Sequence, residues 1–281
     1  MLDLLLDALI DSVKLLPFLF LTYLLMEFIE DKLEDKSRAV LKKAGRLGPV
    51  WGSALGLLPQ CGFSAAAASL YAGKVVTMGT LIAIYLATSD EMLPILISES
   101  ASPKLIAQIL LTKFVFGLII GFIVDIVEHA FFKIKEPDVD IHHFCEHEHC
   151  ECGHGIVKPA AVHTIKIFVF ILVITAVLNV IVDMVGLEAL GSFILNKPVV
   201  GELLAGLIGL IPNCGASVVI TSLYLQGAMN YGTMMAGLLT GAGVGVLVLF
   251  RVNEDIKQNI IITSVLYVAG VLSGILINLI L

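Results

Sequence analysis

Apolar and polar segments alternate along this chain on the length scale of membrane-crossing helices. Long apolar segments predict spans at residues 5–29, 78–97, 104–131, 162–184, 231–250 and 257–281. Shorter apolar segments lie at residues 48–58, 63–73, 199–211 and 216–226. About 20 apolar residues are needed to cross a bilayer core, so the short segments cannot span. The pattern predicts an all-α polytopic membrane protein with six full spans and four short legs.

The short segments form two pairs, and the second pair is a copy of the first. Residues 59–62 read Pro-Gln-Cys-Gly and residues 212–215 read Pro-Asn-Cys-Gly, an offset of 212 − 59 = 153. Between 56–86 and 209–239, 13 of 31 positions are identical. Matched, Pro/Gly-interrupted apolar segments in two halves of a membrane chain are typical of a transporter's binding site. Each half is predicted to hold three full spans and one Pro/Gly-broken helical hairpin.

The distribution of Lys and Arg favours inverted repeats. Residues 1–131 form the first repeat, 132–160 a His/Cys-rich loop and 161–281 the second repeat. With the N-terminus outside, predicted inside loops hold 12 Lys and Arg and outside loops hold 2. This arrangement predicts an N-terminus outside and the 132–160 loop in the cytoplasm. If each broken pair crossed fully, the repeats would be parallel and that loop would lie outside.

Composition narrows the functional classes. Apolar residues make up 58% of the chain and charged residues 15%, which indicates a membrane protein without a nucleic-acid partner. Acidic residues at positions 3, 7 and 11 argue against a cleaved signal peptide. No G-x-x-x-x-G-K-[ST] run and no recognisable enzyme motif occurs, so we expect a gradient-driven transporter and not an enzyme.

The repeated motif supplies candidate substrate ligands. They are Cys61, Cys214, Gln60, Asn213, Ser64 and Ser217. Proline breaks a helix and exposes backbone groups, which the amides and hydroxyls can satisfy. Thiolates select soft ions such as zinc, copper(I) and cadmium. The helix N-termini that follow each break favour anions, so an arsenic species fits as well. Alternatively, each Cys is a small apolar residue at a tight helix crossing.

Carboxylates inside apolar segments are the second set of candidates. Asp90, Glu91 and Glu202 are predicted to bind a coupling ion or proton, because burying charge in a membrane is costly. Asp90 and Glu91 could instead lie in water at the outer end of their span. Lys113 lies mid-span, where pairing with a carboxylate is favoured over snorkelling.

The polar loop between the repeats has the composition of a metal-binding tract. Its candidate ligands are His142, His143, Cys145, His147, His149, Cys150, Cys152 and His154. Imidazole and thiolate are ligands that zinc prefers, so we expect the loop to bind a zinc-like ion. Transport itself requires no cofactor in this interpretation. The alternative is an incidental polar linker.

The paired breaks, Thr-Ser-Asp-Glu at 88–91 and the His-rich loop together resemble a bacterial family of ten-helix heavy-metal exporters. Its members are also labelled arsenic efflux or manganese transporters. The resemblance implies export of a metal or metalloid across the inner membrane. The thiols favour zinc, copper, cadmium or arsenite over manganese. The alternatives are a manganese exporter, or an organic-anion exporter with a metal-sensing loop. The expected partners are the lipid bilayer and the ion substrate, and a homodimer is the assembly considered.

Overall fold

A computed structural model describes most of both repeats. The described residues are 9–10, 12–13, 16–17, 19–25, 47–60, 62–89, 91–132, 157–185 and 199–280. Within these ranges the regular elements are all helices, as predicted. Residues 133–156 of the 132–160 loop and the segments 26–46 and 186–198 lie outside the described residues.

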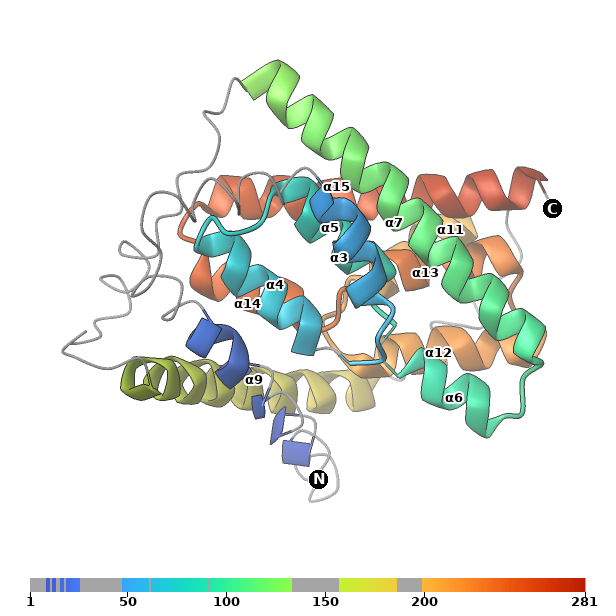
Figure 1. The fold of residues 1–281 in the computed structure, drawn as a ribbon. Coiled ribbons are helices and arrows are strands. Elements are labelled where there is room, and N and C mark those ends of the chain that lie inside the picture. The colour runs from blue at the N-terminus through green and yellow to red at the C-terminus, as the bar shows by residue number, and fades with distance from the viewer. Residues whose placement is uncertain are drawn as a thin grey trace.

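The helices of the two halves follow one another in matching order (Figure 1). The first half contains α3 (Gly48–Gly56), α4 (Gly62–Ala72), α5 (Met78–Ala87), α6 (Met92–Ser98) and α7 (Pro103–Phe132). The second contains α9 (Val157–Val185), α11 (Val200–Gly209), α12 (Cys214–Leu225), α13 (Tyr231–Thr240), α14 (Gly245–Val252) and α15 (Ile256–Ile280). The predicted short legs correspond to α3, α4, α11 and α12, and their ends differ by at most about two residues, within ordinary uncertainty of helix ends.

Two predicted spans, 78–97 and 231–250, are interrupted by short non-helical segments, although each lies in a stretch long and apolar enough to cross a membrane. Residues 88–91 separate α5 from α6, and residues 241–244 separate α13 from α14. Neither gap contains a proline, which is why the sequence predicted continuous helices. In the second gap Gly243 has a φ of 54°, a left-handed conformation that glycine adopts without strain. Each half therefore has two helix breaks.

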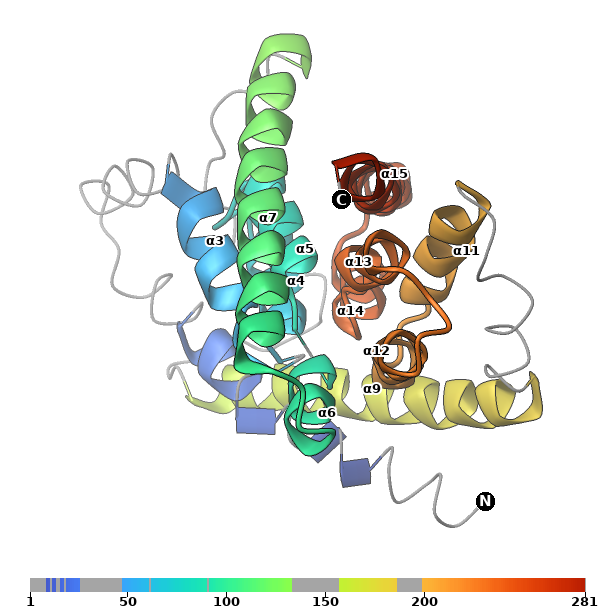
Figure 2. The ribbon, with the colours of Figure 1, turned by 90° about the vertical axis from the view of Figure 1, so that its right-hand side faces the viewer.

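The packing of the first half recurs in the second. Helices α3, α5 and α7 pack on one another, as do α11, α13 and α15. Across the halves, α4 packs against α14 and α12 packs against α6, which is the same contact with the repeats exchanged. Figure 2 shows the two groups side by side, with α9 running beneath both. The exchanged contacts indicate a pseudo-two-fold relation between the halves.

Helices α5 and α13 are the buried centre of the protein, and they contact each other. Glycines allow α7 and α15 to approach them closely. A Cβ added at Gly121 would lie 2.7 Å from the Gly79 carbonyl oxygen, and one at the equivalent Gly274 would lie 2.5 Å from that of Gly232. Small residues at such positions are typical of helix packing in membranes.

The outer faces of the long helices are apolar and exposed, as a lipid-facing surface requires. Exposed side chains on α7, α9 and α15 include Leu111, Ile119, Ile126, Val169, Leu272 and Leu279. In the part of the chain described, helices long and apolar enough to cross a membrane cover Met78–Ser98, Pro103–Ala130, Ala160–Val177, Tyr231–Val252 and Ile256–Ile280. The protein is therefore a multi-pass membrane protein.

Candidate functional site: four helix breaks

The two Pro-containing breaks have the same backbone hydrogen bonds. In the first, the Leu58 N–H donates to the Leu55 carbonyl at 3.1 Å and the Gln60 N–H to the Leu58 carbonyl at 2.7 Å. In the second, the corresponding distances are 3.0 Å from Ile211 to Ile208 and 2.7 Å from Asn213 to Ile211. The repeat is therefore a repeat of backbone conformation as well as of sequence.

Asn213 confirms the expectation that an amide side chain satisfies part of its break. Its side-chain oxygen accepts from the Gly215 N–H at 2.9 Å and so caps the start of α12. Capping side chains supply a partner to amides that the first helical turn cannot pair. The cap on this amide is thus Asn213 and not Ser217, which lies further into the first turn.

The structure describes some of the remaining predicted ligands and not others. Cys61 and Asp90 lie outside the described residues, and of Cys214 only the backbone, at the start of α12, is described. Gln60 and Ser217 are half-buried, whereas Ser64 in the first turn of α4 is fully buried. The proximity of the two thiols stays a prediction.

The proline-free breaks carry their own polar groups. Thr88 donates its hydroxyl to the Ile84 carbonyl at 2.8 Å, and Ser89 donates to the Ala87 carbonyl at 3.0 Å. Both side chains are buried. Glu91 is half-buried and is the last residue of the first of these breaks, directly before α6.

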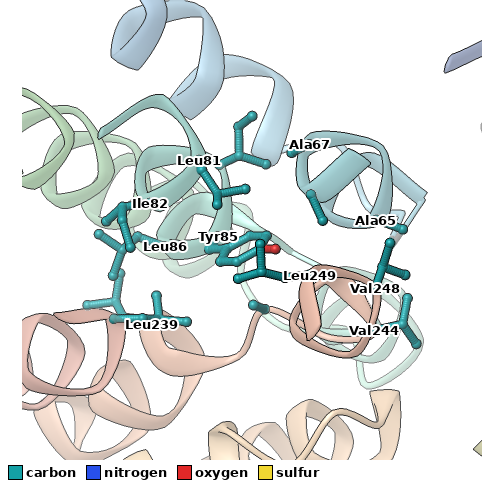
Figure 3. Packing of buried hydrophobic residues seen from close by; sticks show 14 of the residues in the cluster. Ala65, Ala67, Leu81, Ile82, Tyr85, Leu86, Leu239, Val244, Val248 and Leu249 are labelled. Atoms are coloured by element: carbon teal, nitrogen blue, oxygen red, sulfur yellow. The ribbon is translucent and has the colours of Figure 1, made fainter. Parts of the chain in front are cut away.

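Breaks from both halves meet at Tyr85, near the end of α5. Its hydroxyl donates to the carbonyl of Gly245 at 2.9 Å, where α14 begins. A Cβ added at Gly245 would lie 2.7 Å from the Ser64 Cβ and 2.9 Å from the Tyr85 ring. Figure 3 shows Tyr85 among Leu81, Leu86 and Leu249, with Ala65 of α4 beside Val248 of α14. The candidate Ser64 therefore lies at the junction of the halves, whereas no sequence pattern indicated a role for Tyr85.

The side chain of Lys113, in the first half, donates a hydrogen bond to the second half. Its side chain is 1% exposed, and its Nζ donates to the Leu238 carbonyl at 2.6 Å. Leu238 lies in the last turn of α13, where helix carbonyls lack intrahelical partners and carry partial negative charge. Snorkelling is thus excluded, and the recorded partner is a helix end beside a break.

Glu202 is buried, at 2% exposure, but it lies away from the breaks. It sits in the first turn of α11, whereas the Pro-containing break follows the last turn. Seven residues of helix between Glu202 and Gly209 correspond to roughly 10 Å. The structure therefore separates this candidate from the substrate ligands.

The metal-binding tract at 142–154 lies outside the described residues, so its ligands stay a prediction. Among the residues that are described, no group of three or more His, Cys, Asp or Glu side chains could hold a metal ion.

A comparison with protein families identifies the family of this chain. The model of the family described as "Putative, 10TM heavy-metal exporter" matches residues 1–200 and 165–281, which together cover the chain. The chain belongs to this heavy-metal exporter family. No curated protein and no solved structure matches it. Membership in the heavy-metal exporter family agrees with the resemblance seen in the motifs, and the family is one of transporters and not of enzymes.

Proposed function

We propose that this chain is a secondary transporter that exports a thiophilic heavy metal or metalloid across the inner membrane. The observation that carries the proposal is the pair of equivalent breaks, with the same backbone hydrogen bonds at 58–60 and 211–213. Each break follows a short leg and presents a cysteine beside an amide residue. Irregular backbone at membrane depth is tolerated where it is buried in protein or lines a cavity.

Cys61 and Cys214 would be the central ligands, with Gln60, Asn213 and Ser64 beside them. Soft thiolate ligands favour zinc, copper(I), cadmium or trivalent arsenic over manganese. The contacts α4–α14 and α12–α6 support a site between the halves, because each leg that follows a Cys packs on the opposite repeat. Relative movement of the two repeats would then expose the site to one side at a time.

Inverted orientation of the repeats is part of this proposal. In Figure 1, α7 begins at the right and ends at the upper left, whereas its counterpart α15 runs from left to right. Opposite directions of equivalent helices support inverted repeats. The outside N-terminus and the cytoplasmic 132–160 loop of this proposal rest on the distribution of Lys and Arg. That loop would collect a zinc-like ion and deliver it to the breaks.

The test is transport into proteoliposomes across a panel of zinc, copper(I), cadmium, manganese and arsenite. We expect a soft ion to be transported, and Cys61→Ser/Cys214→Ser to lose this transport. The matched control is Ser69→Ala/Ser222→Ala, a pair at equivalent repeat positions about two turns further along α4 and α12. Transport of manganese alone, unchanged in the Cys variant, would contradict the proposal.

An organic-anion exporter is the second candidate, because the starts of α4 and α12 follow the breaks and helix N-termini favour anions. Deleting residues 142–154 separates the two. A metal exporter should change its metal dependence, whereas an organic-anion exporter should keep its turnover.

A further inference from the structure

At the starts of α5 and α13, a side chain from α7 or α15 accepts a hydrogen bond from a backbone N–H of the first turn. We call each of these two arrangements a clamp. In the first half, Asp125 of α7 accepts from the Gly79 N–H at 2.8 Å and from the Thr77 hydroxyl at 3.0 Å. Both carboxylate oxygens are therefore engaged. A carboxylate at a helix N-terminus is stabilised by the helix dipole, so a structural role accounts for Asp125.

In the second half, the clamp is built without a carboxylate. The residue equivalent to Asp125 is Asn278 (125 + 153), and its side-chain oxygen accepts from the Gly232 N–H at 3.0 Å. Asn230 caps α13 by accepting from the Thr233 N–H at 2.8 Å. The backbone N–H groups of Gly232 and Thr233 at the start of α13 thus both donate to neutral amides.

Glu202 is an addition to this neutral clamp. Its Oε1 accepts from the Thr233 hydroxyl at 3.1 Å and from the Asn278 Nδ2. Its Oε2 is buried and has no hydrogen-bond partner in the described structure. The equivalent position in the first half is Pro49, so the fold tolerates an apolar residue there. The hydrogen bonds at the start of α13 do not require Glu202, and burying an acidic group in a membrane costs free energy. We therefore infer that Glu202 has a function.

Among the described helices that pack on α11, none brings a cation close to Glu202. They are α12, α13 and α15, and their only Lys or Arg is Lys257 at the far end of α15. Lys257 is 278 − 257 = 21 residues from Asn278, roughly 30 Å along the helix. The other titratable groups on these helices are the Cys214 thiol and the phenols of Tyr224, Tyr231 and Tyr267, and the Tyr267 hydroxyl donates to the Leu203 carbonyl at 3.1 Å.

We propose that Glu202 is the proton-binding residue of the transporter, with Asn278 and Thr233 as the residues that position it. This inference rests on the proposed function and names its coupling ion. Both donors engage Oε1, which leaves Oε2 to receive a proton. A calcium-like cation would need six or more oxygen ligands, and the described residues supply only one carboxylate here. A neutral carboxylic acid costs far less to bury than a carboxylate.

The step is a simple protonation. A proton from water on one side forms an O–H bond with Oε2, and the neutral acid is carried as α11, α13 and α15 change their exposure. On the other side the O–H bond breaks and the proton returns to water. Substrate moving in the opposite direction would then be exported against its gradient.

Two measurements on the full-length protein test this proposal. The first is labelling of Glu202 by dicyclohexylcarbodiimide, which reacts with protonated carboxyl groups in apolar surroundings, followed by peptide mass spectrometry over a range of pH. The second is proton movement in proteoliposomes, recorded with an internal pH dye when substrate is added. The variants are Glu202→Gln, which keeps an acceptor for Thr233 and Asn278, Glu202→Asp, which keeps a carboxyl group, and Asp125→Asn, the matched control.

We expect Glu202 to be labelled, with labelling lost as the pH rises. We expect Glu202→Gln to lose substrate-driven proton movement while retaining exchange of substrate down its gradient. Glu202→Asp should restore part of the proton movement, and Asp125→Asn should leave it unchanged. Elution of each variant as a monodisperse peak establishes that it folds.

The outcomes separate the two proposals. Absence of labelling at every pH, or normal proton movement in Glu202→Gln, would overturn the proton site. If Glu202 is labelled with the expected pH dependence but the wild type transports no ion of the panel, the substrate assignment fails and the proton site stands.

Discussion

The two repeats meet through equivalent pairs of helices, yet one pair is polar and the other is apolar. Where α7 meets α13, the hydroxyls of Thr112 and Tyr231 lie 3.1 Å apart, and Lys113 Nζ lies 2.6 Å from the Leu238 carbonyl oxygen. Both interactions join the first half to the second. The contact between α7 and α13 therefore holds a buried charge at a specific place.

The same positions on α15, which faces α5, are Val265 and Leu266 (112 + 153 and 113 + 153). Tyr231 is replaced there by Met78. The polar chemistry of this contact is thus confined to one copy of the repeat. Features present in both copies, such as the Cys-containing breaks, suit a shared central site, and features present in one copy suit a directional task such as coupling.

The largest loss of stability should come from Asn278→Asp, which gives the second clamp the carboxyl group of the first. Asn278→Asp removes the donor to Glu202 Oε1 and places two carboxyl groups in contact. A hydrogen bond to a charged group contributes about 1.5–3 kcal/mol, and repulsion between the two carboxyl groups adds to its loss, so we expect the free energy of unfolding to fall by about 3 kcal/mol or more. Asp125→Asn is the reciprocal control and keeps an acceptor for the Gly79 N–H, so it should cost only about 0.3–1 kcal/mol. Thermal unfolding in detergent measures both, and equal losses would contradict the asymmetry.

Lys113→Met should have the next largest effect. Methionine fills a similar volume but cannot donate to the Leu238 carbonyl, and a hydrogen bond from a charged group contributes about 1.5–3 kcal/mol. Leu266→Met at the equivalent position is a volume-conserving exchange and should cost less than about 1.5 kcal/mol. Chemical denaturation of the two variants checks this order, and a larger loss in Leu266→Met would refute it.

Substitutions at the glycine contacts should affect both halves alike. Gly121→Ala and Gly274→Ala push a Cβ against the backbone of α5 and α13, where overpacking costs about 1–3 kcal/mol. Alanine recovers about 1 kcal/mol of helix propensity, so a modest net loss is expected at both sites. The unfolding midpoints should fall by similar amounts. Full tolerance at one site only would show that the halves are packed differently.

The smallest effect is expected at the hydroxyl pair. Thr112→Val removes one cross-repeat hydrogen bond and should cost about 0.5–1.5 kcal/mol. The reverse exchange on the apolar side, Val265→Thr, offers no partner at Met78 and should not stabilise the protein. Thermal unfolding of the two single variants distinguishes these results, and a stabilising Val265→Thr would contradict the apolar character of that contact.

Much of the fold follows from the sequence because the repeat appears twice. The positions of α3, α4, α11 and α12 were predicted since proline and glycine mark both ends of the short legs. The breaks at 88–91 and 241–244 were missed because no proline marks them. A signal was present, since Thr-Ser-Asp-Glu and Gly-Ala-Gly-Val occupy equivalent positions and both sequences form helices poorly.

The candidate site was only partly predictable. The Pro-Gln/Asn-Cys-Gly motifs were identified from local sequence, and the cap by Asn213 is a local interaction. Contacts between residues far apart in sequence could not be found in this way. Tyr85 reaches Gly245, and Asn278 reaches Glu202, through tertiary packing that no local pattern encodes.

The central claim is that Cys61 and Cys214 bind one substrate ion together, and thiol protection tests it most directly. The chain has five Cys, so replacing Cys145, Cys150 and Cys152 by Ser leaves only this pair. Alkylation of the two thiols is then followed by mass spectrometry with and without one equivalent of cadmium or a trivalent arsenical. We expect both thiols to be protected together, and either single Cys→Ser variant to lose protection of the remaining thiol. Independent reaction of the two thiols, or protection that survives in the single variants, would contradict the shared site.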